Sequence, residues 1–440
     1  MLVAAAVMGA ATLAGFMTPW LLLLLTFTLG LGSAINSPAW QAIVPELVSA
    51  SELPSALALS GVGFNVARAV GPALGGLLVA AAGSGFVFLL NALSFVGIIV
   101  VIYRWNRTPQ KSTMPPEHIP GAMRAGVRYV RNAPELQAIL IRSGVFIICA
   151  SALWALLPLQ TRLALGLGSL GYGLLLGCIG AGAIAGAGLL PSVRLKFSND
   201  LLVIFASVVF AAMTIVLAHA HVAWFSALAM LLVGVAWITS MSCFNTAVQT
   251  VAPAWVRGRV LAIYTLVFMG GMAVGSAAWG AVAGRLGVTR ALDLAAAGLV
   301  IGLAFSWRYR LIRVDSLSLA PWVHWPEPIA LIKPEMEHGP VLIHVGYQID
   351  PAKAQEFRHA MRDLQRIRRR DGASRWHLYS DPSEPGRFIE TFIVESWAEH
   401  LRQHGRGTEA DRKTEERVFA FHLGEGAPVA THLISEHVPR

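Results

Sequence analysis

A single arginine stands inside the first strongly apolar part of the chain. Arg68 lies in a predicted helix over 53–82, and no Lys or Arg precedes it in the sequence. A guanidinium at such a position is costly and usually faces the interior of a bundle or a water-filled cavity. Asn65, three residues earlier, lies on the same helical face. Arg68 is therefore the strongest candidate for a functional residue, and a structural ion pair with Glu46 or Glu52 is the alternative.

Two residues recur in register 208 positions along the chain: Gln41 as Gln249 and Pro45 as Pro253. Asn36 and Asn245 lie in the same two segments. A duplication of this length in a membrane protein indicates two parallel bundle halves, as in secondary transporters. The four amides could hydrogen-bond a polar substrate, or equally one another.

Glycine is concentrated beside a proline in the sequence Gly71-Pro72-Ala73-Leu74-Gly75-Gly76. Pro72 removes a backbone donor and bends a helix. The GxxxG spacing of Gly71 and Gly75 lets a neighbouring helix approach closely. A bend beside a close-packed seam suits a gate between two halves, and Gly76 belongs to the same segment. Helix packing without gating is the alternative.

Acidic groups are missing where proton coupling would need them. No Asp or Glu lies well inside a predicted span, since Asp293 is near a span's end and Glu46 and Glu52 fall in a turn. Proton-coupled transport normally needs a titratable group within the membrane. Either the coupling acid belongs to helices that this sequence lacks, or the chain does not couple transport to protons.

No pattern of cysteines or histidines predicts a metal or a cofactor. His400 and His404 are four residues apart without the glutamate of a zinc-protease motif, and we expect a surface pair. His219 and His221 are expected to be exposed in a short external loop. Three cysteines in apolar runs are interpreted as small core hydrophobes: Cys149, Cys178 and Cys243.

Composition places these residues in a membrane protein. Hydrophobic residues make up 55% of the chain and charged residues 13%, whereas soluble domains carry about 25% charged residues. Mean hydropathy is +0.60. A spanning helix needs about 20 apolar residues, and ten segments qualify or nearly do: 2–16, 20–44, 53–82, 86–103, 136–160, 170–191, 201–218, 222–246, 260–284 and 291–307.

The two halves of this scheme are unequal. Three spans precede the duplicated pair in the second half, whereas one span precedes it in the first. We therefore expect that two front helices are missing because the start is truncated, and a natural ten-helix protein is the alternative.

Lysine and arginine gather in the loops on one side of the predicted membrane domain. Thirteen lie on the side of the long loop 104–135, and three lie on the other side. The positive-inside rule then puts that loop and both chain ends in the cytoplasm. Within the loop, Arg124, Arg128 and Arg131 share one face of an amphipathic stretch. This stretch either lies along the anionic inner leaflet or is a solvated linker helix.

The segments 36–46 and 65–76, their partial echo after Asn245 and the basic loop resemble the major facilitator superfamily. More narrowly, they resemble bacterial exporters similar to enterobactin exporters, described as transmembrane secretion effectors. The resemblance covers 1–313 and implies a six-plus-six bundle that alternates between inward-open and outward-open forms. It also implies that the present spans are the third to twelfth helices, that the four amides lie on cavity-lining helices and that the Gly71 segment is antiporter-like. The family's signature loop between its second and third helices is absent together with that region.

A different pattern follows the proline-rich linker 314–340. Residues 341–440 hold 30 of the chain's 59 charged side chains, 15 basic and 15 acidic, which predicts a soluble domain. The order βαββαβ is ferredoxin-like, and it resembles dimeric antibiotic-biosynthesis-monooxygenase-like barrels, with Trp376-His377 and Glu395-Ser396-Trp397 as signposts. That resemblance implies a homodimer through 341–440. The periodicities place strands and helices as follows: strands 341–349, 374–379, 387–396 and 430–438, helices 352–370 and 398–421.

We therefore expect an all-α membrane bundle at 1–313, with halves 1–103 and 136–313, followed by an α+β ferredoxin-like domain. The expected function is secondary active efflux of a siderophore-like or drug-like molecule across the bacterial inner membrane. The expected partners are that small molecule and the lipid bilayer, without nucleic acid. One alternative is a membrane-tethered monooxygenase-like enzyme with a deep pocket at Trp376 or His377. The other is an inactive transporter fragment.

Overall fold

The computed structural model describes residues 1–48, 52–105, 119–304, 309, 322 and 335–436. The chain divides into two compact units, and α5 (Pro134–Leu163), α8 (Ala223–Val251) and α9 (Ala254–Leu286) contribute to both. The first unit comprises 1–114, 148–241 and 274–303, and the second comprises 115–147, 242–273 and 304–440.

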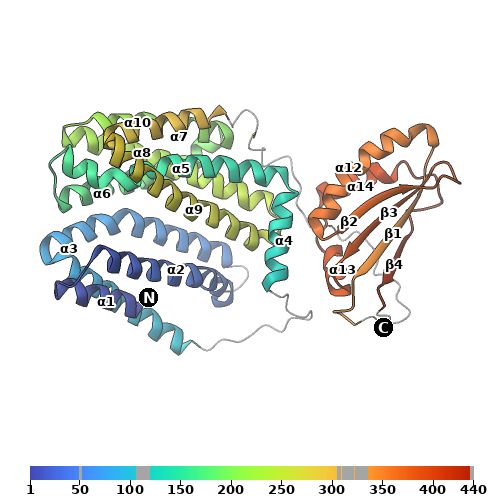
Figure 1. The fold of residues 1–440 in the computed structure, drawn as a ribbon, viewed down its shortest axis with the longest axis horizontal. Helices are drawn as coiled ribbons and strands as arrows, with labels where there is room; N and C mark the ends of the chain where they lie inside the picture. Colours follow the sequence, from blue (N-terminus) through green and yellow to red (C-terminus); the bar gives the residue numbers. More distant parts are fainter. Residues whose placement is uncertain (49–51, 106–118, 305–308, 310–321, 323–334, 437–440) are drawn as a thin grey trace. The chain divides into compact units, whose positions relative to one another are not determined.

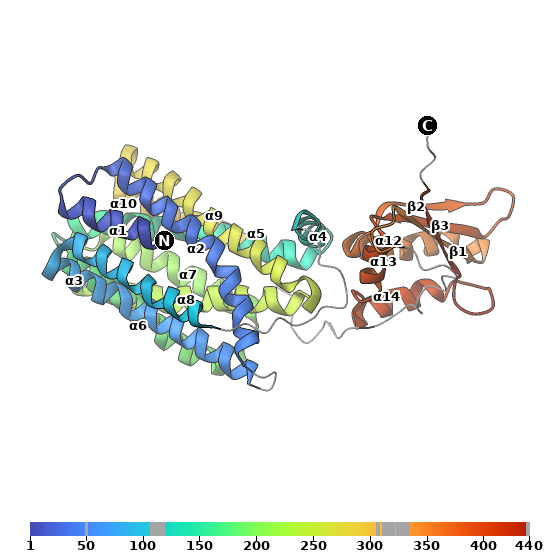
Figure 2. The same cartoon turned by 90° about the horizontal axis from the view of Figure 1, so that it is seen from below.

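Apolar helices build the first unit (Figures 1 and 2). Thr18 accepts a hydrogen bond from the Leu21 amide at the start of α2, where Pro19 takes the first helical position. Ser198 caps α7 in the same way. Besides the three shared helices, the unit contains α1 (Leu2–Leu13), α2 (Pro19–Leu47), α3 (Leu53–Arg104), α6 (Ser169–Arg194), α7 (Asn199–His219) and α10 (Val288–Gly302).

Gly83 divides α3 into two helical pieces. Its φ of 81° and ψ of 163° are not helical, and a positive φ is readily adopted only by glycine. The break falls between the two spans predicted at 53–82 and 86–103. The helix α3 therefore contains both predicted spans.

Six helices of the described part are long and apolar enough to cross a membrane. The sequence predicts ten spans, and each falls on a helix. The numbers differ because α1 and α10 have 12 and 15 residues and because side chains in 34–73 are described only in part. The expected class, an all-α membrane bundle followed by a small α+β domain, is confirmed. The six stretches are 74–104, 134–163, 169–194, 199–219, 223–251 and 255–286.

Glycines let α6 and α8 meet backbone to backbone. A Cβ added at Gly182 would lie 1.9 Å from the carbonyl oxygen of Leu231, and one at Gly234 would lie 2.0 Å from that of Ile179. In a membrane, where apolar side chains gain little from leaving lipid, close packing of this kind is a main source of helix association. Gly182 of α6 and Gly234 of α8 therefore serve the packing of these two helices.

In the second unit, α4 (Ile119–Arg131) packs against the first turns of α9. A Cβ added at Gly126 would lie 2.9 Å from the Cβ of Arg259. Tyr129, which is buried, meets Trp255 edge to face with ring centroids 5.5 Å apart. The linker helix is therefore fixed to the start of α9 by one close approach and one aromatic pair.

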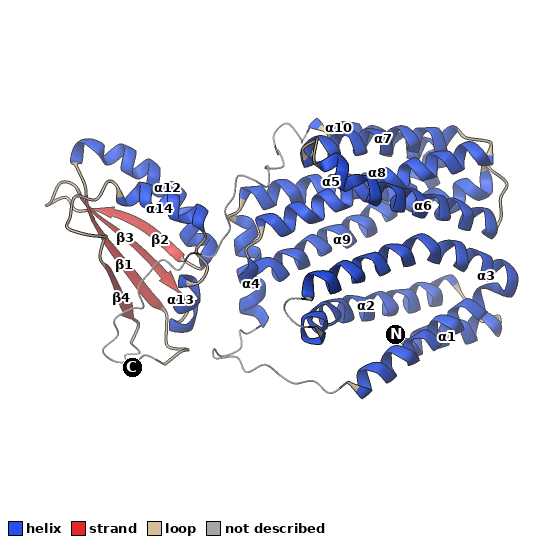
Figure 3. Ribbon diagram, turned by 180° about the vertical axis from the view of Figure 1, so that it is seen from behind, coloured by secondary structure: helices blue, strands red, loops and turns tan. Residues whose placement is uncertain are grey.

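The C-terminal part of the second unit, residues 335–436, is called the tail here. It contains the strands drawn in red in Figure 3, in the order β2-β3-β1-β4, all antiparallel. This is the predicted βαββαβ order, except that the second helical region is split around Gly405 into two helices. The elements are β1 (Val341–Gln348), α12 (Ala354–Asp371), β2 (Ser374–Ser380), β3 (Arg387–Val394), α13 (Trp397–His404), α14 (Glu409–Phe419) and β4 (Ala430–Ile434).

One face of this sheet forms the core of the tail. Alternate residues of β1, from Val341 to Tyr347, are buried against Phe357, Met361 and Leu364 of α12. The strand alternation explains the pattern, because successive side chains point to opposite faces. The helices cover one face (Figure 2), and the other face carries the half-buried residues of β1 and β3.

An ion network lies inside this core. Glu390 is fully buried and accepts hydrogen bonds from Tyr347 Oη at 2.9 Å, Trp376 Nε1 at 2.7 Å and Arg368 Nε at 3.4 Å. Arg368 Nη2 also donates to Glu415 at 2.9 Å. A buried carboxylate is tolerated only when its lone pairs are satisfied in this way. Four elements, β1, β2, β3 and α14, are thereby tied to α12.

Replacing Arg368 by Met should destabilise the tail by about 3–5 kcal/mol, because Glu390 and Glu415 would lose their buried countercharge. Hydrogen exchange of the β1 and β3 amides in the full chain measures this loss. The matched control is Arg369→Met, since Arg369 is the exposed neighbour on the same helix. Equal protection in the two variants would show that the network contributes nothing specific.

Candidate functional site

The predicted pathway residues of the first half lie on α2 and α3. Asn36 is exposed on α2, and Gly71 is exposed on α3, whereas Gly75 and Gly76 are half-buried. Four further predicted residues fall on these helices with side chains outside the described part: Gln41, Asn65, Arg68 and Pro72.

In the segment 71–76, the close contact with a neighbouring helix is made by Gly76, one residue after the GxxxG pair Gly71 and Gly75. Among the described residues, a Cβ added at Gly71 or Gly75 would meet nothing within 4 Å. A Cβ at Gly76 would lie 2.9 Å from the Cα of Gly173 on α6. The close approach at Gly71 and Gly75 therefore stays a prediction, and the one that the described residues show is made by Gly76 and Gly173.

The amides of the second half are neighbours on α8. Gln249 Nε2 donates to Asn245 Oδ1 one helical turn earlier. Asn245 is half-buried and Gln249 is exposed. Of the two outcomes left open for these amides, pairing with one another is the one observed here. One such bond uses one donor and one acceptor, so each amide keeps further hydrogen-bonding capacity.

A polar pair that was not predicted joins α7 and α10. His219 Nε2 lies 3.2 Å from Asp293 Oδ1, and the two side chains are 60% and 38% exposed. The exposure of His219 agrees with the expectation, but its acidic partner lies 74 residues away. A histidine in the last turn of a helix was the available signal.

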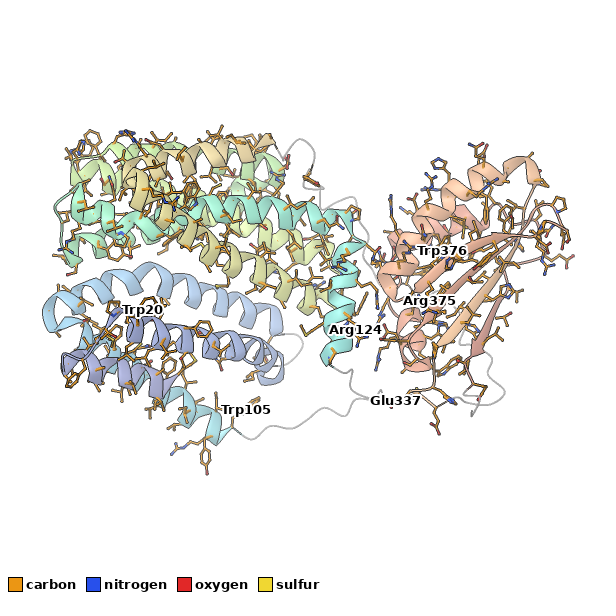
Figure 4. The ribbon with its side chains drawn as sticks, in the orientation of Figure 1. Trp20, Trp105, Arg124, Glu337, Arg375 and Trp376 are labelled. Atoms are coloured by element: carbon orange, nitrogen blue, oxygen red, sulfur yellow. The ribbon has the colours of Figure 1, made fainter. Side chains whose placement is uncertain are left out.

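The tail contains a small cavity of about 50 Å³ beside its ion network. Arg368, His400 and His404 are among its lining residues. Trp376 and His377, around which a catalytic pocket was expected, do not line it. Trp376, which is labelled in Figure 4, donates a hydrogen bond to Glu390. His377 is exposed, and its ring contacts the Arg375 carbonyl.

The expectation of a surface pair is wrong for His400, which is only 1% exposed. Its Nε2 lies 3.1 Å from Nε2 of His404, and its ring centroid is 4.6 Å from that of His432. Burial, with a smaller contribution from the neighbouring histidines, lowers the pKa of His400 to about 3, so the imidazole is neutral near pH 7. Among the described residues, no three His, Cys, Asp or Glu side chains form a group that could hold a metal ion.

The whole sequence matches one protein family. A family model described as "Transmembrane secretion effector" matches residues 1–440. No curated protein matches the sequence.

Solved transporter structures share the fold of the helical part. A POT family transporter in complex with a thioalcohol-conjugated peptide is 12% identical, with a TM-score of 0.55 over 70% of this chain and 80% of that one. A bacterial homologue of the human lysosomal transporter Spinster, inward-facing and unoccupied, is 14% identical, with a TM-score of 0.51 over the same shares. A putative antibiotic biosynthesis monooxygenase from Caulobacter crescentus CB15 is 23% identical over 23% of this chain and 94% of that one, with a TM-score of 0.21.

These identities show the fold alone, and the family rests on the match along the full sequence. With its apolar helices and its transporter fold, the chain belongs to the transmembrane secretion effector family and is a membrane transporter of the major facilitator type.

Proposed function

We propose that this chain exports a small molecule from the bacterial cytoplasm by alternating access. The observation that carries the proposal is the repeat of Gln41 at Gln249 within a chain of this family, because duplicated halves are the basis of alternating access. The substrate class proposed is a small amphipathic molecule, siderophore-like or drug-like. A POT family transporter of similar fold was solved in complex with 5-aminolevulinic acid, so a protein of this fold can hold a small molecule.

Arg68 is proposed to serve the pathway together with the amides. Its cation would attract an anionic or strongly polar group, while Asn36, Asn245 and Gln249 would supply neutral donors and acceptors. The Asn245–Gln249 bond would hold the second amide pair in one orientation. Gly71, Pro72 and Gly76 are proposed to shape the gate.

A membrane-tethered enzyme is the weaker candidate. Its expected centre at Trp376 and His377 has no support from the cavity in the tail, which other residues line. A buried hydrogen bond to Glu390 gives Trp376 a structural role.

Efflux from an efflux-deficient bacterium that expresses the full chain tests the proposal. Fluorescent drugs and labelled siderophores serve as probes. Arg68→Ala should abolish the efflux that the unmodified chain gives. Arg68→Lys should restore only part of it, because an ammonium lacks the planar donor geometry of a guanidinium.

The matched control is Arg290→Ala, since Arg290 is an exposed arginine at the start of α10. It should leave efflux unchanged. Loss of membrane abundance in step with loss of efflux in Arg68→Ala would favour the structural role of Arg68 instead.

We further propose that both chain ends face the cytoplasm of the bacterial inner membrane. The excess of basic residues in one set of loops supports this orientation. A phosphatase reporter that is active only outside the cytoplasm, fused after Arg440, should be silent, whereas the same reporter inserted after Gly166 should be active. The opposite pattern would reverse the orientation.

The open face of the tail sheet is proposed to pair with a second copy of this chain. Leu342 lies opposite Ile393 on one side and Leu433 on the other, so the three form an apolar row across the sheet. Leu433 is 52% exposed, and Tyr379 on the same sheet is 53% exposed. Apolar groups gathered on one face of a soluble domain favour association.

Replacing Leu433 by Glu should shift the purified full chain from dimer to monomer, because a charge would be buried in the paired face. Light scattering coupled to size exclusion in detergent measures the mass of the protein component. Leu423→Glu is the matched control, since Leu423 is 67% exposed in the turn after α14. A monomeric unmodified chain at micromolar concentration would remove the dimer proposal.

A further inference from the structure

Two ion pairs join the linker helix α4 to the tail. Arg124 Nη1 lies 2.6 Å from Glu395 Oε1, and Arg128 Nη2 lies 3.2 Å from Glu399 Oε1 (Arg124 is labelled in Figure 4). The first pair is well exposed and the second is 26% and 10% exposed. Exposed pairs contribute little, so the second pair is the specific one. Of the three arginines on this face, Arg128 contacts the tail in a partly buried pair, while Arg124 and Arg131 are exposed.

Glu399 receives three charge-assisted hydrogen bonds. Arg406 donates to it through both Nη atoms, at 2.7 and 3.0 Å, and Arg128 donates at 3.2 Å. Burial raises the pKa of Glu399, but the two guanidiniums outweigh this effect and leave the pKa below its ordinary value. The carboxylate is therefore ionised at neutral pH and holds a bidentate arginine in place.

The same arginine reaches the start of α9. The Arg406 guanidinium is buried and lies 4.5 Å from the ring centroid of Trp255. Arg370 lies 5.3 Å from the ring centroid of Tyr129 on α4. The Tyr129–Trp255 pair is therefore covered by two cations of the tail, and cation–π contacts strengthen when they are shielded from water.

Gly372, at the end of α12, leaves room for the side chains of Glu399, Arg406 and Arg128. Its φ is +140°, and an added Cβ would lie 3.3 Å from both Arg406 Nη1 and Glu399 Oε1 and 3.4 Å from Arg128 Nη2. A larger residue would be strained at this φ and would press on all three charged side chains. The tail backbone is thus shaped to accept the arginine of α4.

We propose that the tail is a charge-dependent latch, in which Glu399 and Arg406 bind α4 and the start of α9 of the same chain. In the sequence, α4 connects the helices of the two predicted halves. While Glu399 holds Arg128, α4 cannot leave α9 unless the tail moves with it or these contacts break. Release of the latch is therefore a separate, salt-sensitive step that frees the linker. This inference does not rest on the transported substrate.

A distance measurement within the full chain tests the latch. Spin labels are placed at Met123→Cys on α4 and Leu423→Cys in the tail, both well exposed. Cys149, Cys178 and Cys243 are replaced by Ala. Dilution with unlabelled chain keeps the measured distances within one chain. At low salt, one narrow distance distribution is expected.

Arg128→Glu and Trp255→Ala should each lower the ratio of docked to undocked chains by about tenfold, which corresponds to the loss of one favourable contact. High salt should act in the same direction. Arg131→Glu is the matched control, because Arg131 is exposed on the same helix. It should leave the distribution unchanged.

Two further variants separate the latch from a folding defect. Arg124→Glu should change the distribution little, because the Arg124–Glu395 pair is exposed, whereas Arg128→Lys, which keeps the charge of the less exposed pair, should retain most of the narrow distribution that Arg128→Glu loses. Hydrogen exchange in β1 and β3 should stay slow throughout, as in a folded tail. A broad distance distribution in the unmodified chain would overturn the proposal. So would a distribution that stays the same in Arg128→Glu, in Trp255→Ala and at high salt.

Discussion

A lipid bilayer offers no hydrogen-bond partner to a peptide group and little solvation to a charge. The apolar part of this chain obeys that constraint throughout. Its backbone is helical between short turns, and its helices meet at glycines such as Gly182 and Gly234, where only a hydrogen atom fits. Side-chain hydroxyls return to the carbonyl one turn earlier, as Thr214 does to Phe210. A charged side chain in such a segment is costly, which is why the sequence position of Arg68 makes it a candidate for a functional residue.

The tail, in contrast to the apolar helices, is small and rich in charged residues. It buries carboxylates together with their guanidinium partners. Glu390 binds Arg368 inside the core, and Glu399 binds Arg406 at the edge that meets α4. Buried ion pairs add little net stability compared with apolar packing, but each leaves a costly unpaired charge if its partner is removed. In the proposed latch, this cost of an unpaired charge is what would make the tail select α4 of its own chain.

Sequence periodicity predicted the elements because it reports which face of a segment is buried. The break of α3 at Gly83 and the βαββαβ order of the tail follow directly from such patterns. Contacts between residues that are far apart in the sequence leave no periodic pattern from which they could be predicted. The Arg128–Glu399 contact joins residues 271 positions apart. The three- to four-residue spacing of a helix face shows which residues lie together but does not identify the surface that they contact. The same limit applies to the close contact of Gly76, since the spacing of Gly71 and Gly75 does not show which neighbour Gly76 meets.

The burial of His400 was missed for a related reason. An i, i+4 pair on a short polar helix is typical of a solvated face, and α13 is such a helix by its sequence. Its histidine is enclosed because His432 of β4 and Trp397 pack against the ring. Only the folded sheet brings these residues together.

Access to the predicted pathway from both sides of the membrane is the most direct measure of transport by alternating access. Single cysteines at Asn36 and Asn245, in a chain without its native cysteines, can be labelled with a membrane-impermeant thiol reagent in right-side-out and inside-out vesicles. Alternating access predicts that each position is labelled from both sides, and that locking the chain with a substrate reduces labelling from one of them. Labelling from one side only, at both positions and under all conditions, would contradict a transporter mechanism for this chain.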